Sequence, residues 1–170
     1  MDFFLKIKYF ILEMSIRNID IDKLTLKNVK NSWLLSEPIK VRTPKMYIPF
    51  GLEKYYNNYL LKLQFRNIKT DPDIKEFYDF IVQIEQKLKD LLNEEFPSSI
   101  THSEKYDPIV VMKLPQQYNK FICDAFKDRA PFSIFDIEKG SYCICDIIID
   151  SIWKFKGKYY YKIKIKTINF

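Results

Sequence analysis

The chain has 170 residues, 47% of them apolar, so it can bury the core of one ordinary domain and is not a disordered chain. It carries 28 Lys and Arg against 22 Asp and Glu, and this net charge of +6 points toward an acidic partner such as nucleic acid, with a basic protein that has no such partner as the alternative. Only three glycines occur, which argues against a glycine-rich phosphate loop, and the three cysteines lack the regular spacing of a disulfide framework.

The first part of the chain is predicted to be an N-terminal extension. This extension spans residues 1–18, and its first 14 residues are apolar but interrupted by charges, so they suit neither a membrane span nor the basic-then-apolar order of a signal peptide. We therefore expect a protein of the cytosol or nucleus that is not secreted and has no membrane partner. Residues 19–170 are predicted to form a single nucleic-acid-binding domain.

Strand patterns precede the first clear helix. Residues 23–29 and 33–41 read as strands, and the short apolar stretch 46–51 ends at a Pro/Gly corner. The cleanest half-buried strand is 59–66, where aromatic and aliphatic side chains occupy one face. Its other face includes Lys62 and is partly basic, as either a nucleic-acid groove or any solvated face would be.

One long amphipathic helix is predicted from Pro72 to about Asn93. Asp71 is a good N-cap residue, and proline suits the first helical position. Apolar residues recur at three- and four-residue spacing and form one stripe. The stripe consists of Ile74, Phe77, Tyr78, Ile81, Ile84, Leu88, Leu91 and Leu92. This pattern predicts a helix that packs on the sheet or on one end of a barrel.

Strands dominate the rest of the chain. They are predicted over residues 108–114, 121–126, 132–137 and 142–149, and residues 151–170 form a last hairpin. With the earlier strands, this makes about seven short strands and one long helix. Such a series favours a barrel or sandwich over a parallel sheet. We expect a mostly β, α+β domain: an OB-like β-barrel of about five to seven strands with one long helix.

The sequence shows no constellation of catalytic residues. Its only histidine, His102, lies in a polar stretch without a base or nucleophile beside it, which favours a solvated side chain. Cys123, Cys143 and Cys145 are too few for a zinc site without further soft ligands, and buried thiols in a reducing compartment are the expected alternative. We therefore expect no enzyme, no cofactor and no metal site.

The C-terminal hairpin carries the strongest functional signal, because the chain from Ser151 onward holds six lysines and no acid. Its returning strand alternates, and one face consists of Tyr159, Tyr161, Ile163 and Ile165. The opposite face consists of Lys158, Tyr160, Lys162, Lys164 and Lys166. A row of ammonium groups at ~7 Å intervals along a strand can follow a phosphate backbone.

Aromatic residues near these lysines indicate which nucleic acid is bound. Trp153, Phe155 and Tyr160 lie close to the lysines in sequence. Lysines alone would bind duplex as readily, whereas proteins that bind single strands add rings on which bases stack. The alternatives are that Trp153 belongs to the core or the barrel mouth, and that the lysine row protects an edge strand from aggregation.

A second basic and aromatic cluster precedes the helix. It contains Lys40, Arg42, Lys45, Tyr47, Lys54, Tyr55, Tyr56 and Tyr59. Tyr55 and Tyr56 adjoin two asparagines in an expected loop, so at least one ring should be accessible. Lys113 interrupts an apolar strand and is either an outward residue or a phosphate contact.

We therefore predict a surface that binds a nucleic-acid single strand through rings and lysines. The predicted stacking rings are Trp153, Tyr160 and Tyr55. The predicted phosphate contacts are Lys62, Lys113, Lys154, Lys156, Lys158, Lys162 and Lys164.

Several short segments, taken in order, carry a family resemblance over about residues 20–170. The most specific are the Pro49-Phe50-Gly51 corner and the hairpin 152–158 with its glycine turn. The other matching segments are residues 23–26, 47–52, 59–65 with the following helix, 106–109, 113–115 and 139–141. In this order the chain resembles the single-stranded-DNA-binding proteins of large nucleocytoplasmic DNA viruses, which belong to an OB-fold group shared with short-tailed phages.

The resemblance implies a protein that coats exposed DNA strands in viral replication, recombination and repair, in the host cytoplasm or nucleus. Members often end in an acidic tail with a terminal aromatic residue, which recruits replication proteins. This chain ends in Phe170 without those acids, so recruitment of replication proteins in this way is in question. A structural virion or scaffold protein and an RNA-binding OB module remain as alternatives, and a homo-oligomer stays open.

Overall fold

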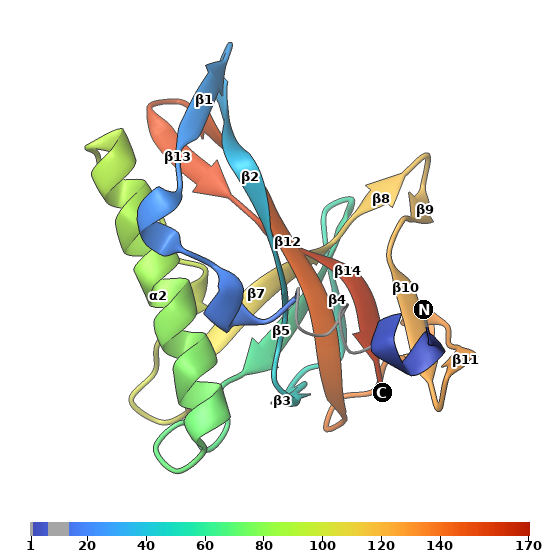
Figure 1. Ribbon diagram of the computed structural model, residues 1–170. Coiled ribbons are helices and arrows are strands. Elements are labelled where there is room, and N and C mark those ends of the chain that lie inside the picture. Colours follow the sequence, from blue (N-terminus) through green and yellow to red (C-terminus); the bar gives the residue numbers. More distant parts are fainter. Residues whose placement is uncertain (1, 7–13) are drawn as a thin grey trace.

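The computed structural model describes residues 2–6 and 14–170. Its centre is a ring of five strands: β12 (Tyr142–Phe155), β3 (Met46–Tyr47), β5 (Asn58–Gln64), β7 (Ile109–Leu114) and β14 (Ile163–Asn169). Each strand pairs with the next, and a further pairing between β12 and β14 closes the ring (Figure 1). The described part of the chain is therefore mostly β and built around a small closed barrel, as predicted.

Other strands extend the barrel at its margins. β2 (Ser32–Arg42) pairs with β12, and β1 (Leu26–Val29) pairs with β2. β13 (Lys158–Tyr161) pairs with the end of β12, so these strands project together beyond the barrel (Figure 1). The remaining strands are β4 (Leu52–Tyr55), β6 (Ile100–Thr101), β8 (Gln116–Gln117), β9 (Lys120–Phe121), β10 (Asp124–Lys127) and β11 (Ala130–Pro131).

The barrel interior is filled by the side chains that alternate inward along each strand. On β5, Leu61 and Leu63 are fully buried, and Phe65 follows them just beyond the end of the strand. Lys62 and Arg66 belong to the outward set, as the alternation predicts. The same alternation on β7 and β14 leaves one outer face across three neighbouring strands, and this face carries most of the candidate site.

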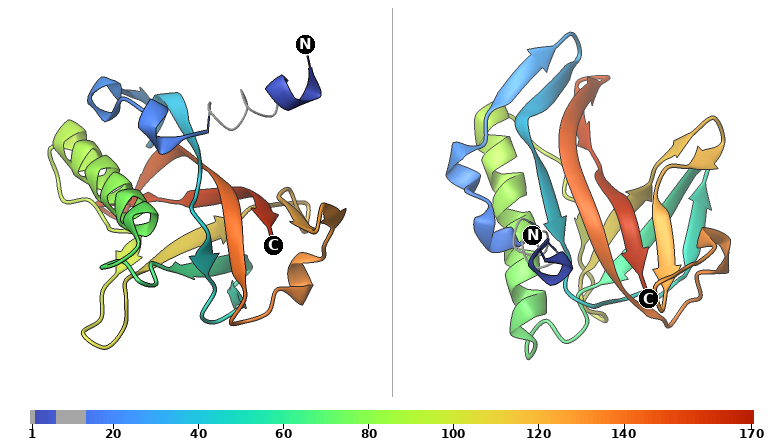
Figure 2. Two further views of the ribbon diagram at one scale, coloured as in Figure 1. Left: turned by 60° about the horizontal axis from the view of Figure 1, so that its bottom comes forward. Right: turned by 45° about the vertical axis from the view of Figure 1, so that its right-hand side comes forward.

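The helix α2 (Pro72–Leu92) begins and ends where the sequence predicts. The Asp71 carboxylate accepts from the backbone N–H groups of Asp73 and Ile74, and Asn93 ends the helix in a left-handed conformation. The helix lies along one side of the barrel, which Figure 2 shows from two further directions. Its buried residues are Ile74, Phe77, Phe80, Ile81, Ile84 and Leu88. Phe80 was not in the predicted stripe, and Leu91, which was, is exposed.

Loss of the helix cap should lower the stability of the whole domain. We expect Asp71→Ala to reduce the free energy of unfolding by ~1 kcal/mol, because two N–H groups at the helix start lose their acceptor. Urea unfolding followed by circular dichroism measures this change. Asp71→Asn is the matched control, since the amide oxygen still caps the helix. Equal losses in both variants would contradict the assigned role.

Three stretches differ from the sequence expectation. Residues 121–126 were predicted as one strand, but they are divided between the end of β9 and the start of β10, and residues 122 and 123 lie in neither. Residues 132–137 were predicted as a strand, but residues 134–136 form the 3₁₀ turn η3 (Ile134–Asp136). The three-residue period of this turn buries Ile134 and Ile137 and leaves Phe135 exposed, a spacing that a strand cannot give. The predicted strand at residues 23–29 is shorter than expected, because its start belongs to the 3₁₀ turn η2 (Ile21–Lys23).

Part of the predicted N-terminal extension packs on the domain. The backbone N–H of Arg42 donates to the carbonyl of Met14. Arg17, in the 3₁₀ turn η1 (Ile16–Asn18), forms a two-point ion pair with Glu76 of α2. Residues 1 and 7–13 of that extension lie outside the described residues. In the part of the chain that is described, no helix has the length and apolar character needed to span a membrane.

Candidate nucleic-acid interface

The tip of the C-terminal hairpin presents two of the predicted rings on one face. Trp153 on β12 lies directly across from Tyr160 on β13. The two rings are stacked, with centroids 6.0 Å apart and planes at 19°. Tyr160 is 38% exposed, and Trp153 is half-buried. Trp153 is therefore outside the core, and the ring pair is a flat surface on which a base could stack.

Lysines crowd beside this ring pair. The Lys162 ammonium lies 5.8 Å from the centre of the Trp153 ring. Burial, the nearby Lys113 and the nearby Lys164 all lower the pKa of Lys162. Among the described residues, neither Lys113 nor Lys162 has an ion-pair partner. Two uncompensated positive charges held close together are stabilised by an anion, and a phosphate group supplies one.

A groove next to these lysines brings in the third predicted ring. The groove has a volume of about 330 Å³, and Tyr55, Lys113 and Lys162 all line it. Tyr55 is 63% exposed at the β4–β5 turn and lies edge-on to Tyr56, with ring centroids 4.7 Å apart. Five predicted site residues thus belong to one continuous surface, which we call the outer groove. The outer groove consists of Tyr55, Lys113, Trp153, Tyr160 and Lys162.

Beneath this groove lies a hydrogen-bonded carboxylate. The Tyr161 hydroxyl donates to Glu85 of α2, and Ser99 donates to the same carboxylate through its backbone N–H and its hydroxyl, each at 2.7 Å. Burial raises the pKa of Tyr161 well above its usual value, and the charge of Glu85 raises it further. The network ties α2 to β13, the strand that carries Tyr160 and ends just before Lys162.

Three other predicted lysines lie on the outer face, but two of them form ion pairs with carboxylates and the third lies at the margin of the site. Lys164 lies beside Lys113 across the β14–β7 pairing, and its ammonium is 3.0 Å from Asp150. Lys62, further along β5, is 3.3 Å from Glu53. Lys158 shares the outer face with Trp153 and is exposed, although it lies beyond Tyr160.

The structure departs from the predicted phosphate contacts at Lys154. Lys154 lies opposite Tyr159, whose side chain points inward, so it is on the other face of the hairpin from Trp153. Its ammonium is 3.1 Å from Glu94, at the end of α2. Lys156 occupies the turn, 5.3 Å from the Phe155 ring. Neither Lys154 nor Lys156 is therefore part of the outer groove.

Sequence reasoning did not assign Phe155 and Lys40 to the site. Phe155 is 58% exposed and shares its face with Trp153. Lys40 lies across from Ile148, which itself lies across from Lys164, so it continues the outer face onto β2. The alternation of β12 is a signal that could have found Phe155, whereas the position of Lys40 depends on a pairing between distant segments.

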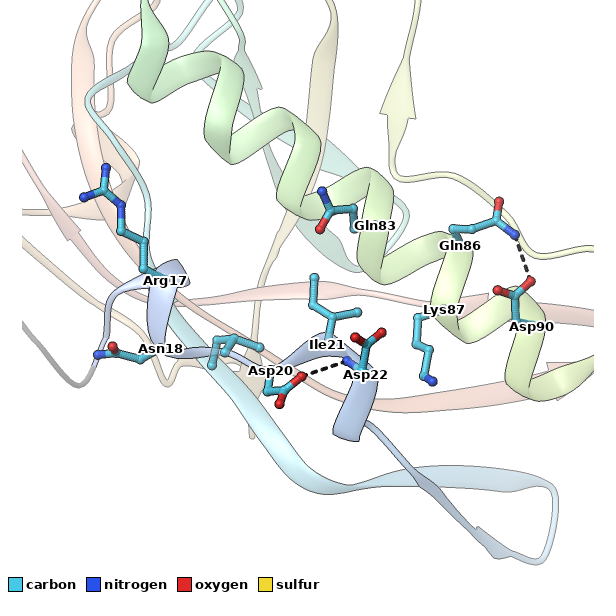
Figure 3. A pocket seen from close by; sticks show the side chains of 10 residues that line it. Arg17, Asn18, Asp20, Ile21, Asp22, Gln83, Gln86, Lys87 and Asp90 are labelled. Carbon is cyan, nitrogen blue, oxygen red and sulfur yellow. Dashed lines mark hydrogen bonds between the residues drawn. The ribbon is translucent and has the colours of Figure 1, made fainter.

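A larger hollow than the groove lies elsewhere. It has a volume of about 650 Å³ and lies between the η1–η2 segment and α2 (Figure 3). Three carboxylates line it, against two basic side chains. The charged lining residues are Arg17, Asp20, Asp22, Lys87 and Asp90. Because acidic side chains outnumber basic ones in this lining, the hollow disfavours binding of a polyanion such as nucleic acid, and we do not place the nucleic-acid interface there.

The cysteines and the histidine do not form a reactive centre. Cys143 and Cys145 are buried with their sulfur atoms 3.7 Å apart. Burial raises the pKa of Cys123 to about 11, so this thiol stays protonated at neutral pH. His102 is exposed, with its ring 2.7 Å from the Tyr78 hydroxyl. Within residues 2–6 and 14–170, no group of three potential metal ligands comes together.

Comparisons with known proteins give structural likenesses and one partial sequence match. No protein-family model matches the sequence. One stretch of 66 residues is 38% identical to an uncharacterized protein, L291, of Acanthamoeba polyphaga mimivirus. The match covers 35% of this chain and only 10% of that protein.

Two solved structures with similar folds come from phages. A C-terminally truncated single-stranded DNA-binding protein of bacteriophage Enc34 is 17% identical, with a TM-score of 0.53 over 87% of this chain and 92% of that chain. Gp2.5, a single-stranded DNA-binding protein encoded by bacteriophage T7, is 10% identical, with a TM-score of 0.55 over 78% of this chain and 86% of that chain. At these identities the likeness concerns the fold, which is the predicted OB-like barrel with one long helix.

Proposed function

We propose that the protein binds single-stranded DNA through the outer groove, by base stacking and phosphate contacts and without sequence preference. The observation that carries the proposal is the pair of lysines without ion-pair partners, Lys113 and Lys162, beside the accessible rings of Tyr55, Trp153 and Tyr160. Phage proteins of the same fold that are named as single-stranded DNA-binding proteins support it. The proposed role is non-enzymatic.

The proposed setting is viral. We infer that the protein coats exposed strands during replication, recombination or repair of a large DNA virus, in the host cytoplasm or nucleus. The phage proteins and the partial match to a mimivirus protein support a viral origin. The proposed partner is single-stranded DNA.

Fluorescence anisotropy with a labelled oligo-dT tests the proposal. We expect binding that weakens as salt rises, because phosphate contacts release counterions from the strand. Unlabelled duplex DNA of the same length should compete poorly, since its bases are not free to stack on rings. Competition with oligo-U decides between DNA and RNA. The proposal is wrong if oligo-dT does not bind, or if its affinity is independent of salt.

The lowered pKa of Lys162 predicts a pH dependence of binding. The charged ammonium contacts phosphate and the neutral amine does not, so its contribution is complete below the pKa of Lys162 and is lost as pH rises through it. This loss begins at a lower pH than for an ordinary lysine, because burial and two neighbouring lysines lower the pKa.

Anisotropy titrations at constant ionic strength between neutral and alkaline pH measure this effect. Lys162→Arg is the matched control, because a guanidinium keeps its charge over the whole range. We expect the arginine variant to lose less affinity than the wild type as pH rises. Identical pH profiles would contradict the assignment of Lys162 as a phosphate contact.

A further inference from the structure

A second group of rings and cations lies at the opposite end of β5 from the outer groove. The Arg66 guanidinium lies over the Tyr47 ring, 4.4 Å from its centre, and donates to the Tyr142 hydroxyl at 3.1 Å. The Tyr47 and Tyr142 rings are 5.2 Å apart, and the Lys45 ammonium is 5.7 Å from the centre of the Tyr142 ring. We call Lys45, Tyr47, Arg66 and Tyr142 the distal cluster.

The distal cluster is open to solvent and keeps its positive charge. Tyr142 is 41% exposed, and Arg66 is exposed. No carboxylate forms an ion pair with Arg66 or Lys45 in the described part of the chain. The fold itself holds the rings in place, since Tyr142 pairs with Tyr47 across β12 and β3. Rigid rings beside uncompensated cations are what an unpaired nucleotide requires.

The outer face of β5 connects this cluster to the outer groove. Leu60 lies directly across from Lys113 of the outer groove, and Gln64 lies across from Tyr47. Between them, Lys62 points outward and lies 5.5 Å from the centre of the Phe50 ring, which is 54% exposed. From Leu60 to Gln64 the strand advances ~13 Å at ~3.3 Å per residue.

We propose that the distal cluster is a second nucleotide-binding subsite, which holds a base and a phosphate of the same DNA strand that occupies the outer groove. This inference rests on the proposed function. The strand would run along the outer face of β5, past Lys62 and Phe50, to the Tyr142 ring. The proposed subsite predicts a length threshold for binding. Short oligonucleotides fill only the outer groove, and longer ones reach both the outer groove and the distal cluster, within the ~4–16 nucleotides that one such barrel covers.

The test compares a short and a long oligonucleotide on four variants. Anisotropy titrations with dT of about 4 and about 12 nucleotides bracket the threshold. We expect Tyr142→Ala to weaken binding of the long oligomer at least about fivefold, the lower end of what one stacked base contributes. Binding of the short oligomer should not change. Tyr142→Phe keeps the ring and should retain the wild-type affinity for both.

Arg66→Ala provides a second variant at an exposed position, in case Tyr142→Ala does not fold. Arg66→Ala should also weaken binding of the long oligomer only. Lys87→Ala on α2 removes the same charge elsewhere and should weaken binding of the long oligomer less than Arg66→Ala does. Wild-type affinities for the long oligomer in Tyr142→Ala and Arg66→Ala would overturn the inference, and so would equal losses for both lengths. In either case the proposed function stands as long as the wild type binds. A wild type that binds neither oligomer would instead refute the proposed function and this inference with it.

Discussion

Trp153→Ala is expected to weaken binding of oligo-dT by about 5- to 150-fold and to leave the protein folded. The range corresponds to ~1–3 kcal/mol for the loss of one base–ring stack. The substitution also removes the surface against which Tyr160 packs, so the loss should fall in the upper part of the range. Because Trp153 is only half-buried and lies outside the core, the barrel should tolerate the change.

Two measurements separate a binding effect from a folding effect. Anisotropy gives the affinity, and thermal unfolding followed by circular dichroism shows whether the domain is intact. Trp153→Tyr is the matched control, because it keeps a ring at the same position and should recover most of the affinity. A Trp153→Ala variant that is folded and binds as tightly as the wild type would show that no base stacks there.

The double variant Lys113→Ala/Lys162→Ala is expected to change the salt dependence of binding as well as its strength. Each phosphate contact on a single strand contributes ~0.7 to the slope of log affinity against log salt concentration, so two lost contacts should reduce the slope by ~1.4. At about 0.1 M salt this corresponds to a loss of roughly 25-fold. Removing two crowded like charges should leave the protein as stable as before, or more stable.

The control for this experiment removes two lysines outside the outer groove. Lys154→Ala/Lys156→Ala takes the same charge from the same hairpin, but Lys154 lies on the opposite face and bonds Glu94. We expect its salt slope to change much less. Equal changes in the two double variants would mean that only the net charge matters and that the outer groove has no special role.

The sequence predicted those features that follow from local rules. Asp71 and Pro72 placed the start of the helix, because a cap and a proline act within one turn. Alternation assigned the inward and outward faces of β5 and β14, and the buried Leu61 and Ile163 confirm it. The same rule placed Tyr160 and Lys162 together on the outer face.

The features that the sequence did not predict depend on pairings between distant segments. Lys154 was predicted as a phosphate contact, but the tight turn sets Phe155 across from Lys158, and this register places Lys154 opposite the inward Tyr159. Its partner Glu94 is 60 residues away in the chain. No local pattern shows such a contact, because it arises only when α2 docks beside the hairpin.

The distal cluster illustrates the same limit. Lys45 and Tyr47 stood out in the sequence as basic and aromatic, but Tyr142 and Arg66 come from strands far along the chain. Only the closure of the barrel brings Tyr142 beside Tyr47. Sequence reasoning therefore found half of this cluster and could not place it on the same face as the outer groove.

Photocrosslinking tests the central claim most directly, because it reports where the strand lies. A dT oligomer of about 12 nucleotides carrying a photoreactive 5-iodouracil at each position in turn is irradiated with the protein, and mass spectrometry identifies the attached residues. We predict crosslinks to Trp153, Tyr160 and Tyr55. Crosslinks confined to α2 and the η1–η2 segment, with none on these three rings, would contradict the account.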